Sequence, residues 1–191
     1  MTYYDSSLYP YIQENFLSKE ACDTIVTYVN NNLNKFDEDN SQDTNFWSKR
    51  VINLEQIESS FIRKLLIYKN AIVGNIIEKV AGRKVYPDSY QIIRWFKGYE
   101  LHPHADKENP DGNPHPFPWR DFASLVYLND DYEGGQIYFP NKEIELKPKP
   151  GTLIFFPGTS EFLHGVREVP EGIRYTLPTF YTFDESKGRY I

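Results

Sequence analysis

The chain has 191 residues, which is enough for one domain with a sizeable core. Its net charge is −6 and it has no basic tract, so binding of nucleic acid by electrostatic attraction is disfavoured. The single cysteine, Cys22, excludes an intrachain disulfide and a cysteine-based metal site.

The cellular location follows from similar exclusions. No apolar run approaches the roughly 20 residues that span a bilayer, and residues 1–10 lack the basic and apolar regions of a signal peptide. A lone cysteine is typical of a reducing compartment. We therefore expect a soluble cytoplasmic protein with no membrane partner.

Two amphipathic helices are predicted in the first part of the chain. The first covers residues 18–36, with Ser18 as N-cap and Glu20 in the first turn. The second covers residues 59–81 and is stopped by Gly82. The apolar stripe expected to be buried on the second helix consists of Phe61, Leu65, Tyr68, Ile72, Ile76 and Val80.

Between and after these helices the pattern changes. The acidic segment 37–44 (DEDNSQDT) is predicted to be a loop, and residues 46–53 a short strand. After Pro87 the apolar period becomes two, which indicates strands. Eight are predicted, at residues 90–96, 100–104, 122–128, 136–139, 144–146, 152–156, 162–169 and 175–183. This order predicts a mainly β jelly roll or related sandwich, with the helices packed on one outer face.

His104 and Asp106 are candidate metal ligands. They lie two residues apart on a predicted strand, so their side chains point to the same face of the sheet. His164 lies in another apolar, strand-like stretch and could return to the same site. Two His and one carboxylate on one side of an ion form the facial triad of non-heme Fe(II) oxygenases.

Arg174 and Thr176 are candidates for binding a carboxylate. On a strand these two residues share a face, so a guanidinium and a hydroxyl can hold the same carboxylate group. His-x-Asp alone is a weak signal, and a lone arginine on a late strand is usually a surface residue. The combination in this order is much harder to produce by chance.

Residues 91–182 resemble the prolyl 4-hydroxylase group of Fe(II)/2-oxoglutarate dioxygenases. The matching stretches are QIIRWFKGYELHPHAD, RDFASLVYLNDDYEGGQIYFP, KPGTLIFFPG and LHGVREVPEGIRYT, and FLSKEACDTIV is similar to the N-terminal helix of that family. The resemblance implies a double-stranded β-helix fold with supporting helices (α+β). It implies one dioxygenase domain, with helical support at about 1–86, the β core at about 87–184 and a tail at 185–191.

The resemblance also implies roles for individual residues. His104, Asp106 and His164 would hold Fe(II), and the open coordination positions would admit 2-oxoglutarate and then O2. Arg174 would bind the far carboxylate of 2-oxoglutarate. The other residues implied at the cosubstrate site are Thr176, Tyr127, Trp95 and Ile137. The family further implies ascorbate as a reductant.

The substrate side follows the family less closely. Trp95, Leu101 and Phe180 replace a Tyr, a Tyr and a Trp that are frequent in the family. Arg120 matches an arginine that contacts substrate in peptidyl-prolyl hydroxylases, and Trp119 beside it could supply an apolar wall; a structural salt bridge is the other explanation for Arg120. The Pro-rich loop between Asp106 and Arg120 would shape the mouth, and we interpret its His115, like His102, as a surface residue.

The implied reaction is hydroxylation of a C–H bond with release of succinate and CO2, and the expected substrate is a prolyl residue in a peptide or protein. Hydroxylation of a free amino acid or small metabolite is the alternative, and an added charged clamp for a free carboxylate would favour it. Phe180 stands where nucleic-acid demethylases of the superfamily usually carry a second arginine, which disfavours that class. A non-enzymatic metal-binding β-barrel is the remaining alternative. The oligomeric state is not indicated.

Overall fold

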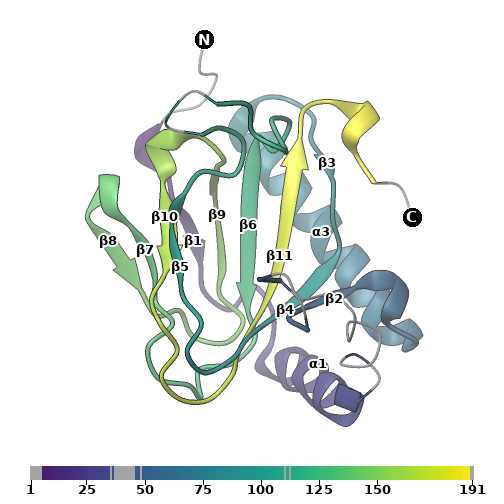
Figure 1. Cartoon of the computed structure of the whole chain (residues 1–191). Helices are drawn as coiled ribbons and strands as arrows, with labels where there is room; N and C mark the ends of the chain where they lie inside the picture. The colour runs from purple at the N-terminus through teal and green to yellow at the C-terminus, as the bar shows by residue number, and fades with distance from the viewer. Residues whose placement is uncertain are drawn as a thin grey trace.

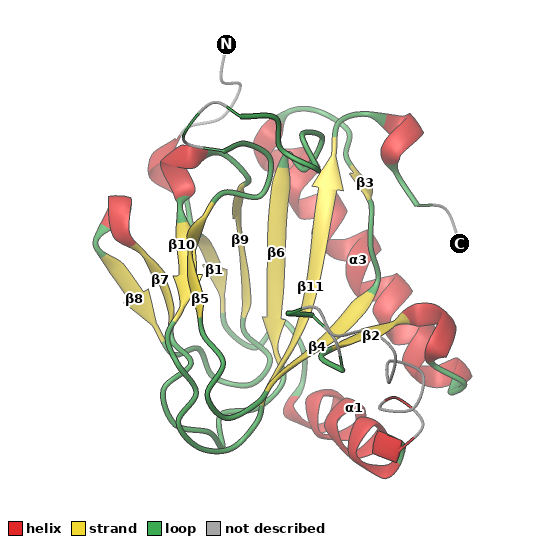
Figure 2. Cartoon of the chain, viewed as in Figure 1, coloured by secondary structure: helices red, strands yellow, loops and turns green. Residues whose placement is uncertain are grey.

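Two β-sheets face each other, and the long helix covers the outer side of the larger one (Figures 1 and 2). This arrangement is seen in a computed structural model that describes residues 6–34, 36, 46–47, 49–109, 111 and 113–189. The predicted acidic loop at 37–44 lies outside the described residues. The predicted mainly β sandwich with helices on one outer face is confirmed.

The helix predicted at residues 59–81 begins and ends where the sequence indicates, whereas the helix predicted at residues 18–36 begins as predicted but ends at Asn31. Helix α1 is Lys19–Asn31, and the Ser18 side chain accepts a hydrogen bond from the backbone N–H of Ala21. Helix α3 is Ser60–Ala81, with Ser59 as N-cap and Gly82 as C-cap. Gly82 has a φ of 64°, a left-handed conformation that glycine adopts without steric cost.

The larger sheet is antiparallel and carries most of the core. Its main strands run in the order β1-β9-β6-β11-β4-β2, and β3 pairs with β11. Strand β9 is buried along its whole length, as expected for a central strand with both faces covered. The bounds are β1 Tyr11–Gln13, β2 Val51–Asn53, β3 Tyr86–Pro87, β4 Gln91–Trp95, β6 Phe122–Tyr127, β9 Leu153–Pro157 and β11 Arg174–Thr182.

The smaller sheet has the order β5-β10-β7-β8 and is also antiparallel. Its strands are β5 Leu101–His104, β7 Ile137–Phe139, β8 Ile144–Leu146 and β10 His164–Val166. All eight strands predicted after Pro87 are present, most of them shorter than predicted. Strands β1 and β3 were not predicted, and the strand predicted at 46–53 is confined to Val51–Asn53.

Helix α3 packs on β11 and β3 through a face centred one position from the predicted stripe, of which Leu65, Ile76 and Val80 are partly buried against the core. Phe61 and Tyr68, assigned to the buried stripe, are 59% and 67% exposed. The apolar residues that are buried lie one position further along: Ile62, Leu66, Val73 and Ile77. Two neighbouring apolar stripes run along this helix, and the sequence alone does not say which one faces the sheet. No helix in the described part of the chain is long and apolar enough to cross a membrane.

Candidate active site

The two candidate histidine ligands lie opposite each other on paired strands. His104 is the last residue of β5 and His164 the first residue of β10, and these residues are partners in the antiparallel register. Their ring centroids are 4.4 Å apart. The strand pairing therefore brings together two side chains that are sixty residues apart in sequence.

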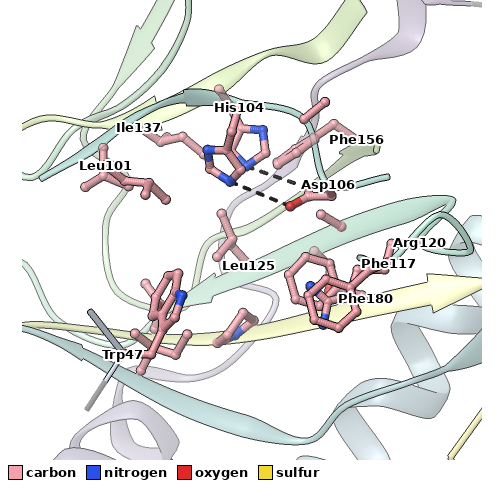
Figure 3. Close-up of a pocket in the computed structure, with 18 of the residues that line it drawn as sticks. Trp47, Leu101, His104, Asp106, Phe117, Arg120, Leu125, Ile137, Phe156 and Phe180 are labelled. Carbon is pink, nitrogen blue, oxygen red and sulfur yellow. Dashed lines mark ion pairs between the residues drawn. The ribbon is translucent and has the colours of Figure 1, made fainter. Parts of the chain in front are cut away.

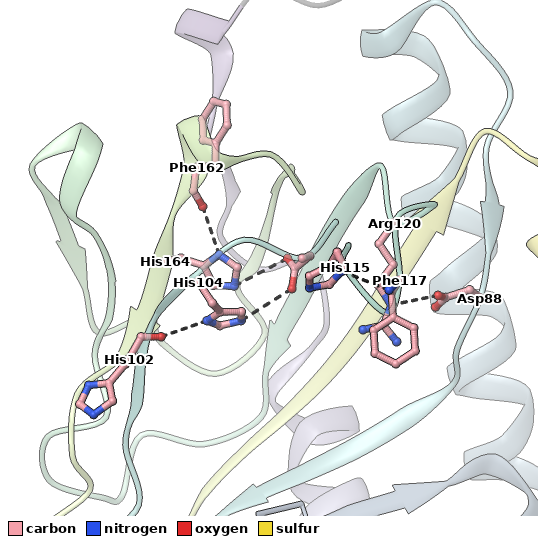
Figure 4. Close-up of polar contacts among 9 residues, drawn as sticks. Asp88, His102, His104, His115, Phe117, Arg120, Phe162 and His164 are labelled. Atoms are coloured by element: carbon pink, nitrogen blue, oxygen red, sulfur yellow. Dashed lines mark hydrogen bonds and ion pairs between the residues drawn. The ribbon is translucent and has the colours of Figure 1, made fainter. Parts of the chain in front are cut away.

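Backbone carbonyl groups orient both imidazole rings. The Nδ1 atom of His104 lies 3.1 Å from the carbonyl oxygen of His102, and Nδ1 of His164 lies 3.1 Å from that of Phe162 (Figure 4). Because a carbonyl oxygen only accepts hydrogen bonds, Nδ1 must carry the proton in each ring. In the neutral rings the Nε2 lone pairs are then free to bind a metal, as is usual for metal-ligating histidines.

Asp106 completes the cluster. One of its carboxylate oxygens lies 3.7 Å from Nε2 of His104 and the other 3.7 Å from Nε2 of His164. Its backbone N–H donates to the carbonyl of Gly158, which fixes the start of the loop after β5. A Cβ on Gly158 would lie 2.2 Å from the carbonyl oxygen of Arg120, so only glycine allows this close approach.

The cluster fits a divalent metal ion. Its ligand atoms lie within 4.8 Å of one another, and the buried Oδ2 of Asp106 has no hydrogen-bond partner among the described residues. Burial lowers the pKa of His164 to about 4, so this ring is neutral near pH 7 and can ligate. Two imidazoles and a carboxylate that face one another without a donor between them are a site for a cation such as Fe(II).

Arg174 lies on the opposite sheet, at the start of β11. It is 1% exposed, and its guanidinium donates to the hydroxyl of Tyr127 on β6 over 3.0 Å. Its Nε has no hydrogen-bond partner in the described structure. Gly135, with a φ of 65°, leaves room for the Arg174 side chain, because a Cβ there would lie 3.1 Å from it. A buried guanidinium with an unused donor is a site for a carboxylate.

A cavity of about 230 Å³ between the two sheets joins these groups. The metal cluster, Arg174 and Thr176 all line it. In Figure 3, His104 and Asp106 lie along one side, and Trp47, Arg120 and Phe180 along the other. Five more predicted site residues line the same cavity: Trp95, Leu101, Arg120, Ile137 and Phe180. Tyr127 is fully buried and reaches the site through its bond to Arg174.

Arg120 lines the cavity and also forms a structural ion pair. Its Nε donates to Asp88 over 3.2 Å (Figure 4). The central carbon of its guanidinium lies 3.8 Å from the ring centroid of Phe117 and 3.7 Å from that of Phe180. The structural salt bridge considered for Arg120 is present, and its contact with substrate stays a prediction. The ion pair and the two rings fix the orientation of a guanidinium that faces the cavity.

The aromatic wall of the cavity and the position of His115 differ from the sequence predictions. Trp119 does not line the cavity; it lies in a separate hollow with Arg83 and Asp184, so it is no wall of the site. Phe117 and Trp47 form that wall instead. His115, interpreted as a surface residue, is half-buried and lines the cavity. The expectation for His102 is confirmed, because its side chain is 87% exposed.

These residues were missed because they lie in loops. No periodic pattern places Trp47 or the Pro-rich loop relative to the sheets. Three residues already complete the predicted metal site, so the sequence did not indicate that His115 lines the cavity. The loop between Asp106 and Arg120 is held by Glu108, whose carboxylate accepts from the backbone N–H and hydroxyl of Ser160. This bond anchors the loop beside the metal ligands.

Comparisons with known proteins agree with this geometry. Residues 90–182, just under half of the chain, match the model of the 2OG-Fe(II) oxygenase superfamily. Human prolyl 3-hydroxylase 2 is 35% identical over 96 residues, which are 44% of this chain and 14% of the human protein. Prolyl 3-hydroxylase 1 of Gallus gallus is 34% identical over 76 residues, 37% of this chain and 10% of that protein. The chain thus spans only a small part of the length of these relatives.

Solved structures share the fold over nearly the whole chain. The 2OG complex of a viral collagen prolyl hydroxylase from Paramecium bursaria Chlorella virus-1 is 19% identical with a TM-score of 0.65, covering 94% of this chain and 95% of that one. A Trichoplax adhaerens prolyl hydroxylase in complex with a hypoxia inducible factor peptide fragment is 18% identical with a TM-score of 0.67, covering 92% and 84%. The solved structures show the jelly-roll fold of 2OG oxygenases, and the match over residues 90–182 supports a prolyl hydroxylase-like 2OG-Fe(II) oxygenase.

Proposed function

We propose that this protein hydroxylates a prolyl residue in a peptide or protein, using Fe(II), 2-oxoglutarate and O2 and releasing succinate and CO2. The observation that carries the proposal is a single cavity with the His104, Asp106 and His164 cluster on one sheet and Arg174 on the other. A metal site and a carboxylate site that face one cavity can hold the two ends of a 2-oxoacid.

The metal site has a defined task in this proposal. Fe(II) bound by His104, Asp106 and His164 would supply the oxidising chemistry that couples decarboxylation of 2-oxoglutarate to hydroxylation. The chain holds both Nε2 lone pairs toward Asp106 by fixing Nδ1–H on backbone carbonyls. Burial of Asp106 and His164 limits the access of water to the ligands.

Arg174 would orient the cosubstrate. Its guanidinium is held by Tyr127 and lines the cavity, so it can pair with the distal carboxylate of 2-oxoglutarate. Thr176 lies two residues along β11 and also faces the cavity, so its hydroxyl can join Arg174 at the same carboxylate. Trp95 and Ile137 would form the apolar walls of this end of the cavity.

The remaining walls support an apolar substrate that carries a few polar groups. Trp47, Phe117 and Phe180 present aromatic surface, and a proline ring packs well against aromatic faces. Arg120 and His115 supply hydrogen-bond donors for carbonyl oxygens of a peptide chain. Prolyl hydroxylases among the relatives, one of them bound to a peptide, add support for a proline-containing partner.

A free amino acid or small metabolite is the second candidate, and Arg120 is the observation that favours it. A guanidinium that lines the cavity could hold the carboxylate of a small substrate. Its ion pair with Asp88 neutralises much of its charge, however, so a neutral peptide carbonyl is the better match. We therefore rank the peptide substrate first.

Two further expectations stay proposals. Ascorbate would act as a reductant that restores Fe(II) after uncoupled turnover. The cytoplasm is the proposed location, because the buried Cys22 is a free thiol of the kind that reducing compartments preserve.

The test is succinate release with Fe(II) and 2-oxoglutarate in the presence of a panel of proline-rich peptides and a panel of free amino acids. The proposal predicts peptide-stimulated succinate release and a gain of one oxygen atom on proline, detected by mass spectrometry. Stimulation by free amino acids alone would support the second candidate. His104→Ala is the control, and unchanged decarboxylation in that variant would show that the site is assigned wrongly.

A further inference from the structure

The side chain of Arg50 is a fully buried cation. Its side chain is 0% exposed, and none of its three guanidinium nitrogens has a hydrogen-bond partner among the described residues. Burial lowers its pKa to about 10, so it remains charged near neutral pH. An unpaired buried charge is costly to retain, which implies that its surroundings stabilise it in another way.

Four aromatic rings surround this guanidinium. Its central carbon lies 3.7 Å from the ring centroid of Phe46, 4.4 Å from that of Tyr99, and 4.6 Å from those of Trp47 and Trp95. The faces of aromatic rings attract cations, most strongly where water is excluded. We call Arg50 and these four rings the aromatic cage.

The cage joins a turn to the main sheet. The backbone N–H of Arg50 donates to the carbonyl of Trp47, and Lys49 has a φ of 59°, so the chain reverses direction before β2. The carbonyl of Arg50 accepts from the backbone N–H of Arg94, and the carbonyl of Lys49 accepts from the Arg94 side chain. Backbone bonds thus fix the base of the turn, and the aromatic side chains at its start contact the Arg50 guanidinium and the rings of Trp95 and Tyr99.

The cage also forms part of the cavity wall. Trp47 and Trp95 belong to the cage and line the cavity, and their ring centroids are 5.8 Å apart. Trp47 is 39% exposed, and in the described part of the chain it contacts the Arg50 guanidinium and the rings of Phe46 and Trp95. The aromatic cage also lies close to the proposed cosubstrate site, because the central carbon of the Arg174 guanidinium is 5.5 Å from the centroid of the Trp95 ring.

We propose that Arg50 is a positioning residue that holds Trp47 in the wall of the substrate cavity, and that it sets substrate affinity without contacting substrate. The proposal rests on the proposed function for its kinetic consequence. Its structural consequence, the position of Trp47, can be measured without any substrate.

The structural test uses the fluorescence of Trp47. The chain has three tryptophans, and Trp119→Phe removes the one outside the cavity; Trp95 is 4% exposed, so acrylamide then quenches mainly Trp47. Arg50→Met keeps an unbranched chain of similar length but removes the charge. We expect the quenching constant to rise about twofold in Arg50→Met and to stay near the reference in Arg83→Met, a cation stacked on Phe183 outside the cavity. An unchanged constant in Arg50→Met would overturn the proposal.

The kinetic test uses the peptide that the wild type hydroxylates best. We expect Arg50→Met to raise the peptide KM about tenfold, with the 2-oxoglutarate KM and peptide-independent decarboxylation changed less than twofold. Trp47→Ala should raise the peptide KM by a similar factor, and the double variant no further, because Arg50 acts through Trp47. Multiplying effects in the double variant, or an unchanged peptide KM in Arg50→Met, would contradict the proposal.

Arg50→Lys covers the case in which Arg50→Met does not fold. It keeps the positive charge but replaces the planar group that stacks on the rings, so both measurements should fall between wild type and the other variants. A lysine variant that folds and equals wild type in quenching and in peptide KM would show that ring stacking has no positioning role. If no peptide is hydroxylated by the wild type, the proposed function fails, and the quenching result still decides the role of Arg50.

Discussion

The two faces of strand β11 use polar residues in opposite ways. On the face toward helix α3, Thr179 receives a hydrogen bond from Lys69 and donates to Asn70, and the Tyr181 hydroxyl donates to the Asn70 carbonyl. On the face toward the cavity, Arg174 leaves its Nε without a partner in the described structure. Both faces are buried and polar, but the hydrogen bonds are complete only on the helix side.

This difference separates structural from functional polar groups. A fully bonded buried network specifies how α3 packs, and it leaves nothing for a ligand to bind. An unused donor or acceptor in a buried site is costly unless a ligand completes it. Oδ2 of Asp106, in the loop after β5, is likewise buried without a hydrogen-bond partner among the described residues. Substitutions on the two faces should therefore have different consequences.

Substitution of a metal ligand should have the largest effect. Removal of a residue that merely orients a metal ligand typically lowers metal affinity or activity by about 10–100-fold. His164→Ala removes a ligand itself, so we expect peptide-dependent succinate release to fall by more than about 100-fold. The metal content after loading with Fe(II) under nitrogen should fall in parallel. A variant that keeps its full metal content and turnover would place the metal elsewhere.

Substitution of Arg174, the proposed carboxylate-binding residue, should have the second largest effect. Arg174→Ala removes charge-assisted hydrogen bonds worth roughly 1.5–3 kcal/mol each, so we expect the 2-oxoglutarate KM to rise about 10–100-fold. Iron content should stay close to wild type, because Arg174 lies on the opposite sheet from the metal ligands. An unchanged 2-oxoglutarate KM would show that the cosubstrate binds elsewhere.

His115 should affect substrate more than cosubstrate. Its Nδ1 accepts the backbone N–H of Phe117, so the neutral ring carries its proton on Nε2, which is available as a donor in the cavity. His115→Ala removes one hydrogen bond worth about 1 kcal/mol, which corresponds to a peptide KM about fivefold higher. His102→Ala, on an exposed histidine, is the matched control and should equal wild type.

On the helix side, Lys69 should affect stability and leave turnover unchanged. Burial lowers the pKa of Lys69 from 10.5 to about 7, so above pH 7 the unfolded chain binds the extra proton and the stability of the fold rises with pH. Between pH 7 and 8.5 this gain is up to about 2 kcal/mol. Urea unfolding should show it in wild type and not in Lys69→Met, and an equal slope in both would assign the dependence to other groups.

Local signals in the sequence predicted much of the fold. Ser18 and Gly82 mark helix ends through chemistry that acts within one turn, and the period-two pattern located the strands after Pro87. The buried face of α3 was wrong by one position because two apolar stripes adjoin. The three-residue strand β1 is too short to show a period, and the burial of Lys69 depends on a partner 110 residues away.

The residues of the candidate site also fall into those that the sequence predicted and those that it missed. His104, His164 and Arg174 lie on strands and Asp106 lies two residues after the end of β5, and the structure brings all four to one cavity. Trp47 and His115 come from loops, and their positions depend on tertiary contacts such as the aromatic cage. The roles of all these residues stay predictions until the variants are measured.

The central claim is that one cavity holds a metal on the smaller sheet and a 2-oxoacid on the larger one. Isothermal titration calorimetry, with 2-oxoglutarate titrated into the metal-loaded protein under nitrogen, tests this claim most directly. The account predicts one site per chain, a metal requirement lost in Asp106→Ala, and weakened binding in Arg174→Ala with metal retained. Binding of equal strength in wild type and both variants would contradict it.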